Sequence, residues 1–393
     1  LNLLQKKDVV ALLPTGYGKS MCYLIPPLVK KKTIFIISPL ISLMEDQKEK
    51  LNKLKIPVAC LHGNNVNINE ELEGILNTTI KIVYMSPEYL INGYGLELAQ
   101  KLVDDNQLKF LAIDESHCLS SWGHDFRNSY LKLIEFRKLF PKIPILALTA
   151  TATPRVLNEI IVLLELNKPL IITTKMDRPN INIKCIEMRK EDNYNIINPW
   201  LQKYKNDKII IYMNSRKECE ILAAKLNNYK CFAYHAGLSK DLRTDIQSDF
   251  NNGNINIIIS TVAFGMGIDQ IVKCVLIIGA PSSIEEYYQQ IGRAGRDNQP
   301  AETVMFFQKK YIIISKKMNK NNKSTAMTTE IINHKSNCLD TVSNYFYNTT
   351  CRRRYILQYF GEIPKFFCCN NCDNCCDEEL KDYTNKIYQC VME

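Results

Sequence analysis

The chain has 393 residues, of which 46% are hydrophobic and 23% charged, an ordinary composition for a globular protein of two or three domains. No stretch approaches the roughly 18 uninterrupted apolar residues of a membrane span, which excludes that class. The net charge of +9 suits a polyanionic partner without requiring one. The first residues, Leu1–Lys7, have no signal-peptide pattern and no initiating Met, so we expect that upstream residues are missing.

In chain order, short apolar runs alternate with helical patterns, and the alternation restarts once. This predicts two parallel α/β sheets rather than one. Between the two sets, residues 176–180 include Pro179 and are predicted to be a linker. The predicted strands are Val9–Leu13, Thr33–Ile37, Ile80–Met85, Phe110–Ile113 and Ile145–Leu148, then Lys208–Tyr212, Cys231–Tyr234, Ile255–Ser260, Cys274–Ile278 and Thr303–Phe307.

A phosphate-binding loop is predicted directly after the first strand. Pro14, Thr15, Gly16, Tyr17, Gly18, Lys19 and Ser20 lead into a helical stretch. A strand, a glycine turn and a helix start aim backbone N–H groups at phosphate. Lys19 is then expected to reach the β- and γ-phosphates of ATP, and Ser20 to help hold Mg²⁺. Leu13 stands where the usual motif has its first Gly, so a coincidental Gly-Lys-Ser turn is the alternative.

Two adjacent carboxylates close another predicted strand, at Asp114 and Glu115. An NTPase needs one carboxylate for Mg²⁺, assigned to Asp114, and one to polarise the attacking water, assigned to Glu115. The alternative is a helix N-cap pair. The two motifs together, in this order and each after a strand, predict an ATPase.

With these motifs in view, the chain resembles superfamily 2 helicases and, more narrowly, the RecQ family of DNA helicases. The resemblance covers essentially the whole chain and implies two RecA-like lobes, residues 1–176 and 177–308, followed by a helical zinc-binding subdomain, residues 309–393, which carries a Lys/Asn-rich insertion. The motifs that carry it are Leu13–Tyr23, Ser38–Gln47, Tyr84–Glu88, Asp114–His117, Ala147–Thr153, Ile211–Arg216, Tyr234–Gly237, Ser260–Asp269 and Tyr287–Asp297.

The segment after the carboxylate pair resembles the aromatic loop with which this family senses single-stranded DNA. Trp122 and Phe126 can stack on bases, Arg127 can meet phosphate, and His124 lies among them. Aromatic clusters are more often part of a core, but the interleaved polar residues favour an exposed loop. A DEAD-box RNA helicase is expected to lack this segment.

The second lobe offers a pair of arginines, Arg293 and Arg296, spaced to face one side of a helix start. By resemblance, Arg296 is the arginine finger that reaches the γ-phosphate, Arg293 assists it, and Gln289 lines the same cleft. Gly267 and Asp269 are expected to couple the nucleotide state to this cleft. The alternative is a solvated surface pair.

Fifteen cysteines are distributed unevenly: eight are scattered before residue 351 and seven lie in the last 43 residues. This favours a reduced, intracellular protein with one metal site over a disulfide scaffold. Cys351, Cys369, Cys372 and Cys375 are the predicted ligands of a structural Zn²⁺ ion. Neighbouring Cys368 and Cys376 leave the register open, and buried or reactive thiols are the alternative. Arg352–Arg354 are expected either to touch DNA phosphate or to form a solvated face.

The sequence also departs from the family pattern. Its adenine-reading element upstream of the phosphate loop is not found, Gln290 stands where the family usually has Glu, and the chain ends just past the zinc motif. Unwinding by this piece alone is therefore open, and a degenerate ATP-binding scaffold or a non-catalytic zinc-dependent DNA-binding module are rival hypotheses. The resemblance implies 3′-to-5′ unwinding of DNA in repair and recombination, with single-stranded and tailed or forked duplex DNA as partners. A nuclear location is expected if the source is eukaryotic, and a cytoplasmic one otherwise.

Overall fold

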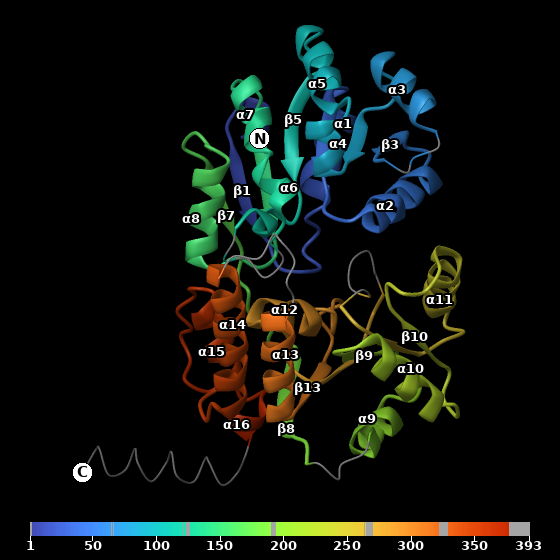
Figure 1. Ribbon diagram of the computed structural model, residues 1–393, viewed down its shortest axis with the longest axis vertical. Coiled ribbons are helices and arrows are strands. Elements are labelled where there is room, and N and C mark those ends of the chain that lie inside the picture. The colour runs from blue at the N-terminus through green and yellow to red at the C-terminus, as the bar shows by residue number, and fades with distance from the viewer. Residues whose placement is uncertain are drawn as a thin grey trace, which may run out of the picture. The chain divides into compact units, whose positions relative to one another are not determined.

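The computed structural model describes residues 2–63, 65, 67–120, 122, 126–189, 194–262, 264, 270–321 and 329–376. The chain divides into two units, Leu1–Lys175 and Met176–Glu393, each built on a parallel sheet with helices on its faces (Figure 1). No described helix is both long enough and apolar enough to cross a membrane.

The first unit is a seven-stranded parallel sheet in the order β3-β4-β2-β5-β6-β1-β7. Its strands are β1 Val9–Leu12, β2 Thr33–Ile37, β3 Val58–Leu61, β4 Ile82–Met85, β5 Leu108–Ile113, β6 Ile145–Thr149 and β7 Leu170–Thr173. Its helices are η1 Leu3–Gln5, α1 Met21–Lys30, α2 Ile41–Lys53, α3 Ile68–Leu76, α4 Pro87–Asn92, α5 Gly95–Asp104, η2 Ser116–Leu119, α6 Asn128–Leu131, α7 Ile134–Leu139 and α8 Pro154–Leu163.

The inner strands of this sheet are buried on both faces, which is why they read as continuous apolar runs rather than as alternating patterns. Every residue of β2 and β4 is buried. Helices begin where a hydroxyl caps the first turn: Ser86 accepts from the N–H of Tyr89, and Thr153 from that of Val156, each followed by a proline at the first helical position.

The second unit contains a six-stranded parallel sheet in the order β10-β11-β9-β12-β13-β8. Its strands are β8 Ile181–Glu187, β9 Ile209–Met213, β10 Cys231–Tyr234, β11 Ile257–Ser260, β12 Cys274–Ile278 and β13 Ala301–Phe307. Its helices are η3 Tyr194–Ile197, α9 Asn198–Lys203, α10 Arg216–Lys225, α11 Lys240–Asn252, α12 Ile284–Ile291, α13 Lys309–Asn321, α14 Thr329–Tyr347, α15 Arg352–Tyr359 and α16 Asp373–Cys376.

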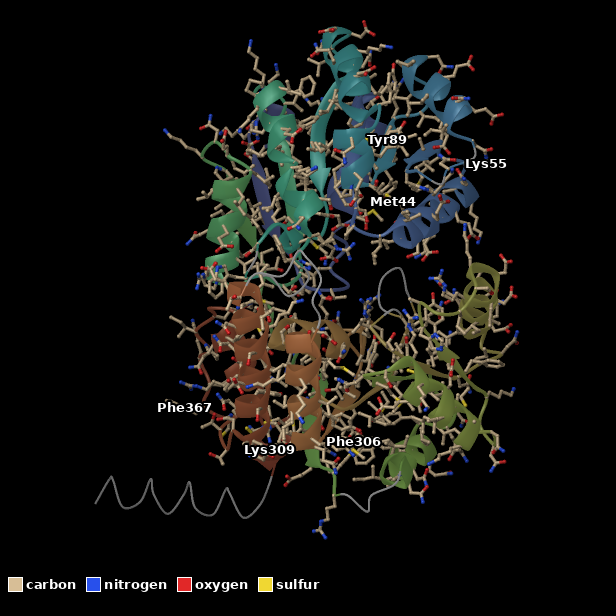
Figure 2. The ribbon with its side chains drawn as sticks, viewed as in Figure 1. Met44, Lys55, Tyr89, Phe306, Lys309 and Phe367 are labelled. Carbon is tan, nitrogen blue, oxygen red and sulfur yellow. The ribbon has the colours of Figure 1, made fainter. Side chains whose placement is uncertain are left out.

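The last helices, α13 to α16, pack on the second unit rather than forming a separate body (Figure 1). Aromatic pairs join them to the sheet domain: Phe307 stacks on Phe346 with 4.4 Å between ring centroids, and Tyr287 packs against Tyr345 at 5.1 Å. Figure 2 shows Phe306 inside this unit, whereas Phe367 on the zinc-binding part is 82% exposed.

The predicted fold class is confirmed: two parallel-sheet α/β units and a helical C-terminal region are present. Each predicted strand matches a strand within a few residues, but β3, β7 and β8 were not predicted. The expected linker is not a free connector. Met176 is 2% exposed and belongs to the core of the second unit, and β8 begins immediately after Asn180.

Candidate active site and metal centre

The predicted phosphate loop connects β1 to α1 at the carboxyl edge of the first sheet. Gly16 and Gly18 have φ of 87° and 73°, a left-handed conformation that glycine adopts without strain. In the described part of the chain, the N–H groups of Gly18, Lys19 and Ser20 donate to no other residue. A loop of this kind offers its backbone donors to an anion.

Leu13, the departure from the usual motif, lies in the core rather than in the loop. It is 8% exposed, and its N–H donates to the carbonyl of Thr149 at 3.0 Å, which extends the pairing of β1 with β6. Its carbonyl accepts from Nζ of Lys19 at 3.3 Å. The Leu13 side chain packs into the core of the first unit, so a residue larger than Gly fits at this position.

Asp114 follows β5 at the same edge and is 8% exposed. Its N–H donates to the carbonyl of Ile37 at 2.9 Å, and its Oδ2 accepts from the hydroxyl of Tyr23 at 3.3 Å. Burial and then the charge of Glu115 raise the pKa of Asp114 to about 6, while Lys19 opposes that shift. Lys19 and Asp114 are therefore electrostatically coupled, as a site for a metal-bound triphosphate requires.

Glu115 has a φ of 49°, which is rare for a residue with a side chain. Its Oε2 lies 3.3 Å from Nδ1 of His117, and the same ring nitrogen is 2.9 Å from Oγ1 of Thr149. His117 is 2% exposed. The imidazole is hydrogen-bonded to the end of β6 and lies beside the carboxylate, whose buried Oε2 makes no hydrogen bond among the described residues.

The aromatic segment is only partly described, and His124 lies outside the described residues. Trp122 is half-buried, with the guanidinium of Arg155 over its ring at 3.3 Å from the centroid. Phe126, also half-buried, lines a hollow of about 800 Å³ with Arg155 and Val162. Arg127 donates to the carbonyl of Pro39 at 2.6 Å. Instead of being fully exposed, these side chains rest against α8 and the end of β2.

In the second unit, Arg293 and Arg296 lie on a turn after α12, not at a helix start as predicted. The helix ends at Ile291, and Gly295 takes a φ of +57°, which a continuing helix cannot accommodate. Arg293 is 8% exposed, and both arginines lower the pKa of the buried Tyr212, which burial raises. We call residues 292–297 the arginine turn.

Two neighbouring residues of α12 complete the description. Gln289 is half-buried, and Gln290, which replaces the usual Glu, is buried and donates to Glu286 at 2.8 Å. Gly267 and Asp269 lie outside the described residues.

The predicted zinc ligands converge. Among the described residues, the sulfurs of Cys351, Cys369, Cys372 and Cys375 all lie within 4.8 Å of one another. Tetrahedral Zn²⁺ with Zn–S bonds of about 2.3 Å needs sulfurs roughly 3.8 Å apart, so the set fits the ion. Contacts with the thiols of Cys369 and Cys372 lower the pKa of Cys351 to about 3.

The backbone supports the same sulfur cluster. The N–H of Arg354 points at Sγ of Cys351 at 3.5 Å, and that of Asn371 at Sγ of Cys369 at 3.4 Å. Cys368 is exposed and is not one of the four; the side chain of Cys376 is outside the described set.

Three sequence families match consecutive parts of the chain: "DEAD/DEAH box helicase" at residues 1–160, "Helicase conserved C-terminal domain" at 191–298 and "RecQ zinc-binding" at 308–376. A putative ATP-dependent RNA helicase of Acanthamoeba polyphaga mimivirus is 39% identical over 95% of this chain and 68% of its own length. The ATP-dependent DNA helicase RecQ of Bacillus subtilis is 35% identical over 98% of this chain and 65% of its own length. The chain belongs to the RecQ family.

Other RecQ relatives are longer. The ATP-dependent helicase SGS1 of Saccharomyces cerevisiae is 38% identical over 95% of this chain, but only 26% of that relative is spanned. Among solved structures, helicase Lhr of Mycobacterium smegmatis bound to ssDNA and AMP-PNP superposes with a TM-score of 0.61 at 16% identity, covering 84% of this chain and 47% of that one. Helicase MrfA bound to DNA gives 0.63 at 20%, covering 80% and 49%. These two show the fold alone.

Within this RecQ-family chain, both hypotheses for Arg352–Arg354 are wrong for the first two arginines. Arg352 and Arg353 are 5% and 4% exposed, and they pair with Asp373 and Asp177 at 3.0 Å each. Arg354 donates to the carbonyl of Phe366. Arg352 also donates to the carbonyls of Tyr345 and Phe346, whereas the acceptors of Arg353 lie 172 to 176 residues away. A buried charge needs such acceptors, and a local pattern does not reveal them.

Sequence reasoning also missed the residues that support the RecQ carboxylates. Tyr23 and Thr149 lie inside the quoted motifs but were given no role, although each hydrogen-bonds to a residue of the Asp114–His117 motif. The only signal in the sequence was their presence in those motifs.

Proposed function

We propose that this chain is the core of an ATP-driven motor that is stimulated by DNA and unwinds it in the 3′-to-5′ direction, in repair and recombination. The proposal is carried by one observation: Lys19, Asp114 and Glu115 meet at the carboxyl edge of one parallel sheet, with Lys19 acting on the buried carboxylate of Asp114. Family membership and the zinc cluster support it.

The chemistry assigned to the first unit follows from these positions. Lys19 and the loop amides bind the β- and γ-phosphates, while Ser20 and Asp114 hold Mg²⁺, which neutralises phosphate charge. Glu115, which lies beside His117, polarises the attacking water. The charge of Glu115 raises the pKa of Asp114. A bound cation would relieve this repulsion, so the closeness of the two carboxylates favours cation binding.

The arginine turn supplies the remaining charge. We assign Arg296 to the γ-phosphate in the transition state, with Arg293 assisting and Gln289 beside the nucleotide; such an arginine contributes about 10³–10⁵ in rate in GTPases. Gly267 and Asp269 are proposed to couple nucleotide state to this turn. We further propose that the second lobe begins at Met176, one residue earlier than expected, because Met176 packs in the core of that unit, that it reaches residue 308, and that the zinc subdomain spans 309–393.

DNA, single-stranded or as a tailed or forked duplex, is the proposed partner, in the nucleus if the host is eukaryotic and in the cytoplasm otherwise. Trp122, His124, Phe126 and Arg127 are its proposed contacts, by base stacking and phosphate pairing. RNA is the second candidate, because one relative is named a putative RNA helicase. The match to the RecQ zinc-binding family favours DNA.

The test is ATP hydrolysis with and without single-stranded DNA, and with single-stranded RNA of the same length. Glu115→Gln is the inactive variant, and Glu97→Gln, at an exposed position of the same unit, is its matched control. We expect DNA to stimulate hydrolysis in the wild type and in Glu97→Gln only. Stimulation by RNA alone would refute the DNA assignment. A wild type that binds ATP but never hydrolyses it would refute the motor, and unwinding of DNA with 3′ or 5′ tails tests the polarity.

A further inference from the structure

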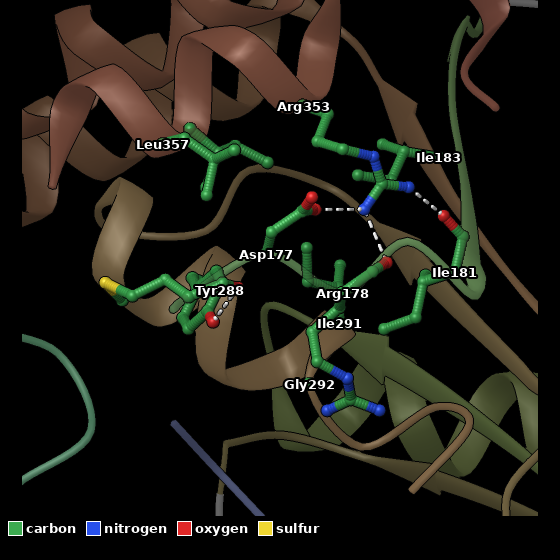
Figure 3. Close-up of a pocket in the computed structure, with 11 residues that line it drawn as sticks. Asp177, Arg178, Ile181, Ile183, Tyr288, Ile291, Gly292, Arg353 and Leu357 are labelled. Carbon is green, nitrogen blue, oxygen red and sulfur yellow. Dashed lines mark hydrogen bonds and ion pairs between the residues drawn. The ribbon is translucent and has the colours of Figure 1, made fainter. Parts of the chain in front are cut away.

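The first residue of the second unit is held by α12 and by the segment that follows α15. The N–H of Met176 donates to Oε1 of Glu362, which follows α15, and the hydroxyl of Tyr288 in α12 donates to the carbonyl of Met176, both at 2.6 Å. The cavity beside this segment measures only about 20 Å³ (Figure 3), room for about one water molecule. The segment is therefore packed, not hinged in open solvent.

Arg178 connects this segment to the arginine turn. Its Nη2 donates to the carbonyl of Ala294 at 3.1 Å and to that of Gly295 at 2.7 Å, and the residue is 9% exposed. Ala294 and Gly295 are the two residues between Arg293 and Arg296. The guanidinium of Arg178 thus hydrogen-bonds to the backbone between the two arginines that are assigned to ATP hydrolysis.

Arg353 holds the backbone from which Arg178 projects. From α15 it donates to the carbonyls of Arg178 and Ile181, the latter at 2.5 Å, and it pairs with Asp177 at 3.0 Å (Figure 3). It lies two residues after Cys351, one of the four clustered cysteines. α15, which follows the clustered Cys351, therefore contacts the backbone of Arg178 through the buried side chain of Arg353.

A second contact fixes the same turn. The side-chain amide of Asn180 donates to the carbonyls of Gly295 and Gln299 at 2.8 and 3.0 Å. Gly295 has a φ of +57°, and a Cβ there would lie 2.5 Å from Nδ2 of Asn180. The turn is also held by a bridge between Ala294 and Val272, by the N–H of Gly295 donating to the carbonyl of Val272 at 2.9 Å, and by Lys273 pairing with Asp297 at 2.9 Å. Arg178 and Asn180 are the side chains that bind the backbone carbonyls on its other side.

We propose that Arg178 and Arg353 are positioning residues for ATP hydrolysis. Arg178 holds the arginine turn in place relative to the start of the second unit, and Arg353 holds that start in place relative to α15. The zinc subdomain thereby affects where Arg293 and Arg296 lie. The inference rests on the proposed function, since it concerns the efficiency of arginines assigned to hydrolysis. It also gives the zinc subdomain a role in turnover in addition to its own folding.

A simpler explanation must be separated from this one. A buried guanidinium needs carbonyl or carboxylate acceptors wherever it lies, so the contacts of Arg178 could serve stability alone. Stability alone predicts a lower Tm with unchanged turnover at temperatures well below the transition. Positioning predicts a fall in kcat with little change in KM for ATP, because the arginines act chiefly on the transition state.

The experiment compares Arg178→Gln and Arg178→Lys with Arg137→Gln in the first unit. Arg137 is the control for loss of a buried guanidinium: it is 7% exposed, donates to the carbonyls of Pro141 and Ile143, and pairs with Asp8 at 2.7 Å, as Arg353 pairs with Asp177. We expect Arg137→Gln to lower Tm only, and Arg178→Gln to lower DNA-stimulated kcat on the order of tenfold to a hundredfold at constant KM. Arg178→Lys, which keeps a cation able to reach one carbonyl, should recover part of the loss.

Two further variants make the outcome decisive. If Arg178 acts through Arg296, Arg178→Gln costs nothing more in an Arg296→Ala background. Arg353→Gln should retain one zinc per chain and lose kcat as Arg178→Gln does; wild-type kcat with full zinc would overturn the link to α15. Unchanged kcat in Arg178→Gln, beside an active wild type, would overturn the positioning role. An inactive wild type would instead refute the proposed function.

Discussion

The hydroxyl of Tyr23 donates a 3.3 Å hydrogen bond to Oδ2 of Asp114, although 91 residues separate them in the chain. Both side chains are buried. Burial and the charge of Glu115 raise the pKa of Asp114 to about 6, and the bond from Tyr23 acts in the opposite direction. Tyr23 therefore helps to keep ionised the carboxylate proposed to hold Mg²⁺.

Replacing Tyr23 by Phe should move the acid limb of the pH–rate profile to higher pH. In the wild type we expect kcat/KM for ATP to fall as pH drops through about 6, where Asp114 takes up a proton in the free enzyme. Without the Tyr23 hydroxyl, the pKa of Asp114 rises further, so kcat/KM begins to fall at a higher pH. Profiles between about pH 5 and 8 measure the shift; superimposable profiles would show that the bond does not tune the carboxylate.

Glu302 should stabilise the fold in a pH-dependent way. Burial alone would raise the pKa of Glu302, but hydrogen bonds from Lys184 and Lys203 outweigh it and lower the pKa to about 2. Because the folded pKa is depressed, the stabilisation is present above the unfolded value of 4.5 and is lost as pH falls toward 2. Glu302→Gln should cost about 2 kcal/mol at neutral pH.

Thermal unfolding at several pH values tests this, with Glu330→Gln as the control because Glu330 is exposed. The difference in Tm between Glu302→Gln and the wild type should shrink once the pH is below 4.5, the unfolded value. A difference that is constant from neutral to acidic pH would mean that the cost is one of packing and not of charge.

Zinc content should distinguish a clustered cysteine from a nearby exposed one. Cys372→Ser removes one of the four clustered sulfurs, whereas Cys368→Ser changes an exposed thiol outside the four. We expect metal analysis of Cys368→Ser to give the zinc content of the wild type, and Cys372→Ser to lose the metal and to unfold α15 and α16 at lower temperature. The converse result would mean that Cys368 is a ligand and Cys372 is not.

Gly279 should be intolerant of any side chain because of Asn214. The Asn214 amide pairs with both sides of the next residue, donating to the carbonyl of Ala280 at 2.8 Å and accepting from its N–H at 3.2 Å. A Cβ on Gly279 would lie 1.6 Å from Oδ1 of Asn214, and φ is +126°. Gly279→Ala should destabilise the protein by roughly 2–4 kcal/mol.

A double-mutant cycle with Asn214→Ala separates the two causes. In that background the collision is gone and only the backbone strain remains, so Gly279→Ala should cost less than in the wild type. Equal costs in both backgrounds, measured by urea unfolding, would show that strain alone excludes a side chain at this position.

Local patterns predicted the inner strands and one edge strand, β10, but missed the edge strands β3, β7 and β8. The buried inner strands read as apolar runs. The four-residue β7 is also an apolar run, but it lies at the sheet edge, where Leu170, Ile171 and Ile172 are 40–44% exposed. The arginine turn was misread as a helix start, because a spacing of three suits a helix whether or not glycines beside it break the helix.

The sequence by itself determined the chemical inventory: the phosphate loop, the carboxylate pair and the cysteine spacing are local signals, and each is decided by neighbours within a few residues. Only the tertiary structure decided how those groups are supported. Arg353 lies in a basic run that was expected to touch DNA phosphate or to be solvated, yet its partners Asp177 and Ile181 are 176 and 172 residues away. A buried charge is stable only where such distant acceptors converge, and convergence is a property of the fold.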